Sequence, residues 1–347
     1  MKEDKIQKIL NNLVDNKKIF GTVIRVANFE NEIFSGSSGN LNEDSQYFIA
    51  STTKLYTTAM IMKLRYEGKL SLDDTLDKFF SSEIIKGLNN FQGGDYSNQV
   101  TVRHLISQTS GIPDYFEGKG PDGKSLVDKL ILGQDQSWTF ERSLEIAKEQ
   151  KSKFKPGQPG KALYSDTNFQ LLGRIIEILF NDTVENVFEK NIYTPLQLNK
   201  TYMYSNIEDR NPQNMYYKDR PFYIPQAMIS VRADGGIVST SDDSMKFIKA
   251  FFSGTFFPVE YFEEMRAEYR GVMFPLQYGI GIMRFKLPRY FTLFTEMPEL
   301  IGHSGLSGAF EYYCPDKKIF ITGTVNQIAN PSLSYRMLVQ ILNLLLK

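Results

Sequence analysis

Cysteine, histidine and tryptophan are scarce in this 347-residue chain, which has one cysteine, two histidines and one tryptophan. The single cysteine, Cys314, excludes a disulfide within the chain, and no cysteines and histidines stand at the spacing of zinc ligands. We therefore expect Cys314 to be a buried strand residue, and we expect the protein to act without a metal or organic cofactor.

Excess charge of one sign and long apolar runs are lacking as well. Lysine plus arginine and aspartate plus glutamate each number 40, so no net field attracts nucleic acid. No apolar run reaches the roughly 18 residues of a membrane span, and the N-terminal 20 residues lack the apolar core of a signal peptide. We expect a small-molecule substrate, and either a cytoplasmic protein or an exported one whose signal peptide is missing from this sequence. Nothing in the sequence indicates the oligomeric state.

The composition is that of a folded protein with a substantial core, because 41% of the residues are hydrophobic and 26 are phenylalanine. The N-terminal 20 residues are helix-like. Residues 21–29 and 31–39 alternate apolar and polar side chains around a turn at 30–32, which predicts an antiparallel hairpin. From Ser51 onward the spacing becomes helical, and Gly68 is a plausible helix end. The expected buried face of this helix comprises Leu55, Ala59, Met62 and Tyr66.

Helix-like segments continue through the middle of the chain, and strand-like segments return late, before a final helix at 332–347. The expected helices are 72–80, 100–108, 139–150, 168–180 and 183–193; the expected strands are 277–287, 290–297, 308–314 and 318–327. We predict an α/β (α+β) fold in which an antiparallel sheet is flanked by terminal helices and interrupted by a large all-helical insertion. This single domain of 1–347 would have its sheet region at about 1–48 and 235–347 and its helical region at about 49–234. An active site is expected in the cleft between them.

Ser51 and Lys54 form an S-x-x-K sequence, and a spacing of three on a helix places the serine hydroxyl and the lysine amine within mutual reach. A serine becomes a good nucleophile when a neighbouring base removes its proton. The pattern alone is weak, because Ser152 and Lys155 repeat it. We favour Ser51 because it opens an apolar helix, whereas Ser152 lies among lysines and is expected to be solvated.

Two later segments contain further candidate residues. Tyr164 and Asp166 stand between a Gly/Pro-rich turn and a predicted helix, so that Tyr164 is presented at a loop-to-helix junction. The sequence Gly-His-Ser-Gly at 302–305 begins a probable strand, where glycine permits close approach of another molecule. Of the two histidines, His303 is the candidate for function, whereas His104 is expected to be structural.

Taken together and in this order, these segments resemble the serine β-lactamase-related and penicillin-binding-protein-like family. It includes class C β-lactamases, D-Ala-D-Ala carboxypeptidases, D-aminopeptidases and certain esterases. The resemblance spans about Gly21 to the C-terminus. It also includes the landmarks YEGKLSLDD, VTVRHLISQTSGIPDY, FKPGQPGKALYSDTNFQLLG and RADGGIVSTSDDSMKF.

The resemblance implies that Ser51 attacks a carbonyl group, with Lys54 and Tyr164 sharing the general-base and general-acid roles. It also implies an oxyanion hole formed by the backbone N–H groups of Ser51 and Leu306. Asp166, His303, Ser304 and Gly305 are implied as substrate-binding or auxiliary residues, and no metal site is implied.

Two residues depart from the family pattern. Asp166 stands where many members have asparagine; if it approaches Lys54, it favours a protonated lysine, and Tyr164 becomes the expected acceptor of the Ser51 proton. His303 replaces the lysine of the usual Lys-Thr-Gly motif and is largely neutral at pH 7, which weakens the demand for an anionic substrate terminus.

The resulting hypothesis is a serine hydrolase that acts through an acyl-enzyme on a small ester or on a D-amino-acid peptide or amide. The alternatives are a D-Ala-D-Ala carboxypeptidase or a true β-lactamase. An alternative of another class is a penicillin-binding sensor or a non-catalytic binding module on the same fold.

Overall fold

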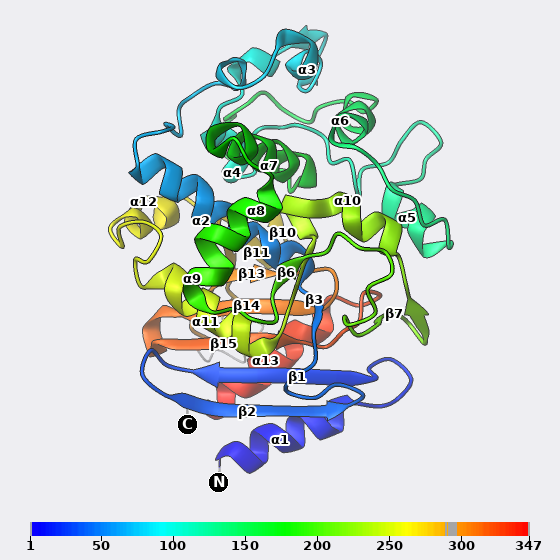
Figure 1. Cartoon of the computed structure of the whole chain (residues 1–347), viewed down its shortest axis with the longest axis vertical. Coiled ribbons are helices and arrows are strands. Elements are labelled where there is room, and N and C mark those ends of the chain that lie inside the picture. The colour runs from blue at the N-terminus through cyan, green and yellow to red at the C-terminus, as the bar shows by residue number, and fades with distance from the viewer. Residues whose placement is uncertain (1, 289, 291–296, 346–347) are drawn as a thin grey trace.

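A computed structural model describes residues 2–288, 290 and 297–345 (Figure 1). Within these residues the largest sheet has eight antiparallel strands in the order β10-β11-β12-β13-β14-β15-β1-β2. The N-terminal hairpin joins the last strand of the chain, with Val23 opposite Thr324. The strands are Gly21–Ala27 (β1), Glu32–Gly39 (β2), Arg270–Met273 (β10), Leu276–Tyr278 (β11), Met283–Phe285 (β12), Leu300–Ser304 (β13), Ala309–Cys314 (β14) and Ile319–Thr324 (β15).

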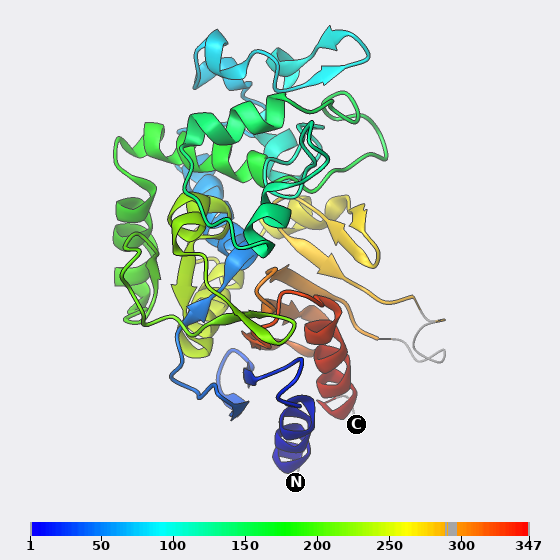
Figure 2. The same ribbon diagram turned by 90° about the vertical axis from the view of Figure 1, so that its right-hand side faces the viewer.

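Helices cover both faces of this sheet. The terminal helices α1 (Lys2–Leu13) and α13 (Ser332–Leu345) pack together on one face (Figure 2), where the Thr22 hydroxyl contacts the sulfur of Met337. On the other face Thr322 donates a hydrogen bond to Ser241 O at the start of α11 (Ser241–Phe252). Strand β1 is therefore buried nearly throughout, which explains its almost continuous apolar sequence.

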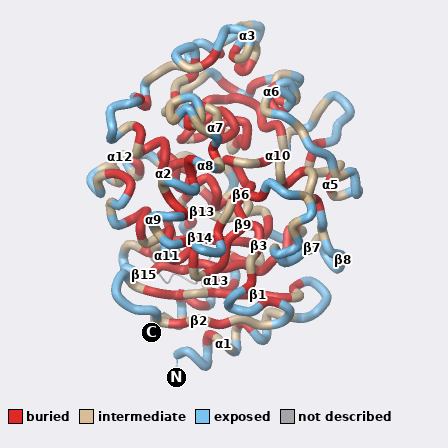
Figure 3. The backbone as a smooth tube through the Cα atoms, viewed as in Figure 1, coloured by how far each residue is buried: buried red, intermediate tan, exposed pale blue. Residues whose placement is uncertain are grey.

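Helix α2 (Thr53–Tyr66) runs through the middle of the molecule, where α7 (Asp166–Phe180) and α10 (Pro225–Gly235) pack against it (Figure 3). It is buried on nearly all sides, including polar residues such as Lys54 and Thr57. The prediction of a one-sided apolar helix is therefore wrong, and Tyr66, assigned to its buried face, is 61% exposed. Gly68, with φ +69°, follows the helix end as expected.

The inserted region contains the remaining middle helices and also short strands, so the prediction of an all-helical insertion is incomplete. Three small sheets of the described residues are β3-β9-β6, β4-β5 and β7-β8. The helices are α3 (Ser82–Ile85), α4 (Val102–Ile106), α5 (Leu126–Ile131), α6 (Phe140–Lys148), α8 (Val184–Phe188) and α9 (Thr194–Leu196). The strands are β3 (Tyr47–Phe48), β4 (Asn90–Phe91), β5 (Gly94–Asp95), β6 (Tyr202–Met203), β7 (Met215–Tyr217), β8 (Arg220–Phe222) and β9 (Ile237–Ser239).

Several boundaries differ from the predictions. The expected helix at 72–80 is a single 3₁₀ turn, Leu76–Lys78, and the expected strand at 277–287 is divided between β11 and β12. Among the described helices, α3, α5, α9, α10, α11 and α12 (Tyr261–Ala267) were not expected, and the last two lie in the region assigned to the sheet. The strand expected at 290–297 lies almost wholly outside the described residues.

One expectation from the scarce features, that for the single cysteine, is met in the structure. Cys314 ends β14 and is fully buried, as predicted. Among the described residues, no helix has both the length and the apolar character needed to cross a membrane.

Candidate active site

Ser51 lies in the short 3₁₀ turn Ala50–Thr52 that leads into α2. The turn is held by a hydrogen bond from Ile49 N to Ile237 O of 3.0 Å. Ala50 has φ +47°, a left-handed conformation that costs a non-glycine residue free energy. The backbone immediately before the serine is therefore constrained.

Gly305 allows the end of β13 to lie directly against this turn. A Cβ atom at position 305 would stand 2.5 Å from Ile49 O and 2.9 Å from Ala50 Cβ. The close approach expected of these glycines is thus made by another part of the same chain.

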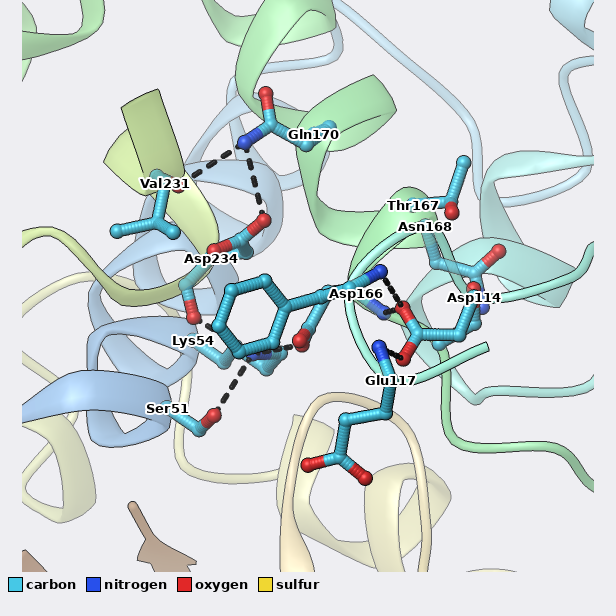
Figure 4. A network of polar contacts seen from close by, with 12 residues as sticks. Ser51, Lys54, Asp114, Glu117, Asp166, Thr167, Asn168, Gln170, Val231 and Asp234 are labelled. Carbon is cyan, nitrogen blue, oxygen red and sulfur yellow. Dashed lines mark hydrogen bonds and ion pairs between the residues drawn. The ribbon is translucent and has the colours of Figure 1, made fainter. Parts of the chain in front are cut away.

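Lys54 is fully buried, and its ammonium group has three partners (Figure 4). Nζ lies 3.2 Å from Ser51 Oγ and 2.7 Å from Asp166 Oδ1, and it donates a 2.6 Å hydrogen bond to Asp234 O. Burial lowers the pKa of Lys54, but the charges of Asp166 and Asp234 and the hydrogen bond to Asp166 outweigh it and raise the pKa above its ordinary value. Lys54 is therefore protonated in the resting site.

Tyr164 lies beside these groups, with its ring centroid 5.3 Å from Lys54 Nζ. Burial and the charge of Asp166 raise the pKa of Tyr164 well above its ordinary value, and the hydrogen bond with the Ser51 side chain opposes this only in part. The phenol is thus also protonated at rest. The structure brings Ser51, Lys54, Tyr164 and Asp166 together.

Two buried carboxyl groups complete the polar network, and sequence reasoning did not single them out. Asp114 accepts hydrogen bonds from the backbone N–H groups of Asp166 (2.9 Å) and Glu117 (2.8 Å). Burial and the neighbouring Asp166 raise the pKa of Asp114 to about 8. Both acids stand inside motifs, SGIPDY and RADGG, that serve as landmarks of the family resemblance.

Asp234, the second of these acids, accepts hydrogen bonds from the Tyr115 hydroxyl (2.9 Å) and from Gln170 Nε2 (3.0 Å). Burial, followed by the charge of Asp166, raises the pKa of Asp234 well above its ordinary value. The loop and helix that carry Tyr115 and Gln170 thus fix this carboxyl group, while the backbone carbonyl of Asp234 contacts Lys54 Nζ.

His303 is fully buried behind the site. Its Nδ1 lies 2.8 Å from Ser304 O and its Nε2 lies 3.2 Å from the Tyr278 hydroxyl. Because a carbonyl oxygen only accepts, Nδ1 carries the proton and Nε2 accepts from Tyr278. Burial, and then the charge of Lys54, lowers the pKa of His303 to about 3, so the ring is neutral.

Ser304 also faces the protein, because its hydroxyl is hydrogen-bonded with the hydroxyl of Tyr335 on α13. Neither His303 nor Ser304 is among the described residues that line the cavity at Ser51. Both side chains are thus engaged by groups of the protein itself, His303 by Ser304 O and Tyr278, and Ser304 by Tyr335. Lys54 and Tyr164 are likewise not among the described residues that line this cavity.

A cavity of about 60 Å³ opens at Ser51. Ser51 and Leu306, whose backbone N–H groups are the expected oxyanion hole, both line it. A larger cavity of about 660 Å³ lies against β10–β12 and contains none of the predicted site residues. The apolar side chains of the smaller cavity are Phe116, Val127, Met215, Phe222, Ile224, Met228, Val231, Leu306 and Ile328, and its acidic ones are Glu117, Asp166 and Asp234.

The competing motif at 152–155 lies outside any helix, just before Pro156. Ser152 is only 7% exposed, so the expectation that it is solvated is wrong. Lys155 Nζ lies over the Tyr96 ring, 4.5 Å from its centroid. The two S-x-x-K motifs therefore differ in local structure and not in burial, because only Ser51 leads into a helix. His104 has a structural role, since it completes a capping box with Thr101 at the start of α4.

This fold, with a buried lysine three residues after a serine at the start of a helix, is compared with known protein families. The chain belongs to the beta-lactamase family, whose model matches residues 6–340. The family and the fold that the sequence motifs predict are thereby confirmed.

Individual relatives show how far the similarity extends. A putative D-alanyl-D-alanine carboxypeptidase of Escherichia coli O157:H7 is 28% identical over 170 residues, which are 49% of this chain and 36% of that protein. The chain thus spans about a third of the length of the curated relatives that it matches. The octameric penicillin-binding protein homologue of Pyrococcus abyssi is 28% identical with a TM-score of 0.77, over 99% of this chain and 78% of that one.

The D-amino acid amidase of Ochrobactrum anthropi SV3, in complex with D-phenylalanine, has a TM-score of 0.80 at 19% identity, over 99% of this chain and 98% of that one. At this identity the comparison establishes the shared fold. The names carboxypeptidase and amidase are those of hydrolases, the class expected from the sequence motifs.

Proposed function

We propose that this chain is a serine hydrolase that forms an acyl-enzyme at Ser51 with a small ester or with a D-amino-acid amide or peptide. The observation that carries the proposal is the contact of Ser51 Oγ with the buried Lys54 ammonium at 3.2 Å, next to a cavity that Ser51 itself lines. Nucleophilic acyl transfer requires a serine that is accessible and in contact with a side chain that can relay its proton.

The proton of Ser51 needs an acceptor, and the resting site offers a protonated Lys54 and a protonated Tyr164. Asp166 Oδ1 lies 2.7 Å from Lys54 Nζ, so in our scheme Lys54 first transfers a proton to Asp166. The neutral Lys54 then accepts the proton of Ser51. The charge argument from the sequence instead assigns the first proton to Tyr164 when Asp166 is near Lys54. Burial and Asp166 oppose a tyrosinate, so we favour Lys54.

In this scheme Ser51 Oγ bonds to the carbonyl carbon, and the developing oxyanion is stabilised by the N–H groups of Ser51 and Leu306. The bond to the leaving group then breaks. Tyr164 donates its proton to the departing oxygen or nitrogen and regains one from Lys54. Water repeats the sequence at the acyl carbon and releases the acid.

The cavity favours substrates without a carboxylate next to the scissile bond. Its lining is largely apolar and its charged side chains are acidic. His303 is neutral and buried, so it supplies no cation for a substrate carboxylate. An ester or amide substrate therefore fits better than the carboxylate-terminated peptide of a D-Ala-D-Ala carboxypeptidase, or a β-lactam.

The test compares the wild type with Ser51→Ala, using p-nitrophenyl acetate and butyrate, D-phenylalanine amide and a fluorescent penicillin. We expect Ser51-dependent turnover of esters or amide, and an acyl adduct on Ser51 by intact-protein mass spectrometry. A penicilloyl adduct that persists without any turnover would instead support the sensor alternative. Full turnover by Ser51→Ala would overturn the assignment of the nucleophile.

A further inference from the structure

The cavity of about 660 Å³ against β10–β12 is separate from the proposed reaction, since none of its described lining residues takes part in that reaction. It lies at one end of the large sheet, where β10 is the edge strand. Figure 2 shows the β10–β11 hairpin, in yellow, at the periphery of the molecule. Cavities of about 300 to 1,000 Å³ are usual for small-molecule sites. This cavity is therefore large enough for a ligand of its own.

The wall of this cavity is largely apolar. Eight of its twelve described lining residues are apolar, from the buried Leu276 and Met297 to Met273 and Phe274 at the tip of the β10–β11 hairpin. Met273 is 63% exposed and Phe274 is 68% exposed. Apolar side chains that gather at a surface mark an interaction site, and methionine adapts its shape to different apolar partners. The wall therefore suits an alkyl chain, which is withdrawn from water when it lies there.

The charge on the described part of the wall is positive only. Arg284 and Lys286 line the cavity, and its described lining includes no aspartate or glutamate. These two residues stand two positions apart, within β12 and just beyond it, so their side chains project from the same face of the sheet. Lys286 is exposed, and its ammonium group makes no hydrogen bond or ion pair with a described residue. This cation is therefore available to a ligand.

Arg284 is held in a fixed position beside the cavity. Its guanidinium carbon lies 4.1 Å from the centroid of the Tyr269 ring, and its Nε donates a 2.8 Å hydrogen bond to Gln277 Oε1. Glu299 lies 3.5 Å from Arg284 Nη1, but this acid is shared with Arg266. Because a guanidinium has five N–H donors, these contacts leave part of its capacity for an anion.

We infer that this cavity binds a single-chain amphiphile with an anionic head group, of the class of a long-chain carboxylate. Lys286 and Arg284 bind the carboxylate through charge-assisted hydrogen bonds, and the alkyl chain lies along the apolar wall. A neutral head group would leave both cations without a partner. The site is distinct from the Ser51 cavity, so the inference does not depend on the proposed function.

The experiment is calorimetry of the full chain with dodecanoate and dodecanol, each below its micelle concentration and at a pH where the carboxylate is ionised. We expect one dodecanoate per chain, bound about 10- to 100-fold more tightly than dodecanol, as for charge-assisted hydrogen bonds. Lys286→Gln should lower this preference by about 10-fold. The matched control is Lys8→Gln, an exposed position on α1, which packs on β1 and β2 at the other end of the sheet. It should keep the wild-type preference.

A steric variant locates the ligand. Gly271 pairs with Gln277, which pairs with Arg284, so all three face the same side of the sheet. A Cβ atom at Gly271 meets nothing within 4 Å, and Gly271→Trp therefore fills the cavity without a clash at its attachment point. We expect it to weaken the binding of dodecanoate and dodecanol alike, with the unfolding temperature close to that of the wild type.

Two results would overturn the inference. Dodecanoate binding that Lys286→Gln and Gly271→Trp both leave unchanged would place the ligand elsewhere, the Ser51 cavity included. If the wild type does not bind dodecanoate, the site is not one for a single amphiphile. Cosedimentation with phosphatidylglycerol vesicles in that case would assign this face to a membrane surface instead. Ester turnover by the same variants tests the proposed function separately, because neither substitution touches Ser51 or Lys54.

Discussion

At the scale of single residues, the chemistry depends on how one buried lysine shares its protons. Lys54 Nζ has three partners, Ser51 Oγ, Asp166 Oδ1 and Asp234 O. Only the ammonium form has three N–H groups and can donate to all three. Asp166 thus has two opposite effects in our scheme. It stabilises the charged lysine, and it is also the acceptor through which Lys54 becomes a base.

Asp166→Asn separates these effects. Without the carboxylate, the pKa of Lys54 falls, because burial still lowers it and the charge and hydrogen bond of Asp166 no longer raise it; Asp234 opposes the fall in part. If Lys54 is the base, the ascending limb of the kcat/KM profile moves to lower pH, by about 1 to 3 units for the loss of a contacting opposite charge. Stopped-flow ester acylation between pH 5 and pH 10 measures this limb. A limb that stays in place in Asp166→Asn, as in the surface control Asp77→Asn, would exclude Lys54 as the titrating base.

Gly305 gives a steric test of the nucleophile turn. In Gly305→Ala the new methyl group would meet Ile49 O at 2.5 Å, so the end of β13 and the turn must move apart. We expect a loss of about 1 to 3 kcal/mol in the free energy of unfolding, as for overpacking, together with slower acylation of Ser51. Gly271→Ala is the matched control, because a Cβ at Gly271 meets nothing within 4 Å. Equal stability of the two variants would show that the approach of β13 to the turn is not tight.

The residues of the site differ in how far the sequence could predict them. Ser51 and Lys54 are predictable because a helix fixes their separation. Asp114 and Asp234 come from a loop and from a kinked helix, and their approach to the segments that carry Asp166 and Lys54 depends on tertiary packing that no local pattern encodes. Glu117 has no motif of its own, and its exposure beside the cavity is visible only after folding.

At the scale of elements, the kink of α10 places two of its backbone carbonyl groups where side chains of α2 donate hydrogen bonds to them. Arg232 has φ 40° and ψ −114°, a conformation that non-glycine residues avoid. Its guanidinium is held by Glu185 at 2.8 Å and by Glu177 at 2.7 Å. Beyond the kink, Ala233 O accepts from the Thr57 hydroxyl and Asp234 O accepts from Lys54, each at 2.6 Å.

A comparison of Arg232→Ala with Arg232→Gly isolates the backbone strain at this kink. Both variants lose the ion pairs with Glu177 and Glu185, but glycine adopts positive φ without a penalty. We expect Arg232→Gly to be more stable than Arg232→Ala by about 1 to 3 kcal/mol in urea unfolding, the reverse of the order at an ordinary helix position. The opposite order would mean that α10 relaxes when the ion pairs are removed.

Periodicity predicted several long elements, although α10 and α11 were missed, and the short strands escaped it for a physical reason. The β1–β2 hairpin, α7 and α13 are long enough for their apolar spacing to be read. Strands of two or three residues, such as β3 and β6, show no period. They exist because β9 pairs with both of them, which is a long-range contact.

At the scale of the whole molecule, the site lies where the large sheet meets the inserted region. The loop after β13 contributes Leu306, while α7 and α10 of the inserted region contribute Asp166 and Asp234. The pairing of β1 with β15 brings strands from both ends of the chain side by side in this sheet. The order of segments could suggest this arrangement. The packing that buries ionisable groups between the sheet and the inserted region could not be predicted from the sequence.

Glu311 on β14 is such a group, fully buried beside the nucleophile turn, where the Thr52 hydroxyl lies 3.3 Å from its Oε1. Burial raises the pKa of Glu311 from 4.5 to about 8, although hydrogen bonds with Ser244 and Thr52 lower it in part. The folded protein therefore keeps Glu311 protonated at pH values where the unfolded chain has released the proton. This contribution to stability is complete below pH 4.5 and is lost as the pH rises toward 8.

Glu311→Gln removes this titration but keeps a similar shape. We expect the free energy of unfolding of the wild type to fall with rising pH between about 5 and 8 more steeply than that of Glu311→Gln, by up to about 1.4 kcal/mol per pH unit. Urea unfolding at pH 5, 6, 7 and 8, followed by Trp138 fluorescence, measures the slopes, with the exposed Glu30→Gln as control. Parallel slopes for wild type and Glu311→Gln would mean that Glu311 is already ionised in the folded protein. The contact between the sheet and the nucleophile turn would then hold a buried charge instead of a neutral acid.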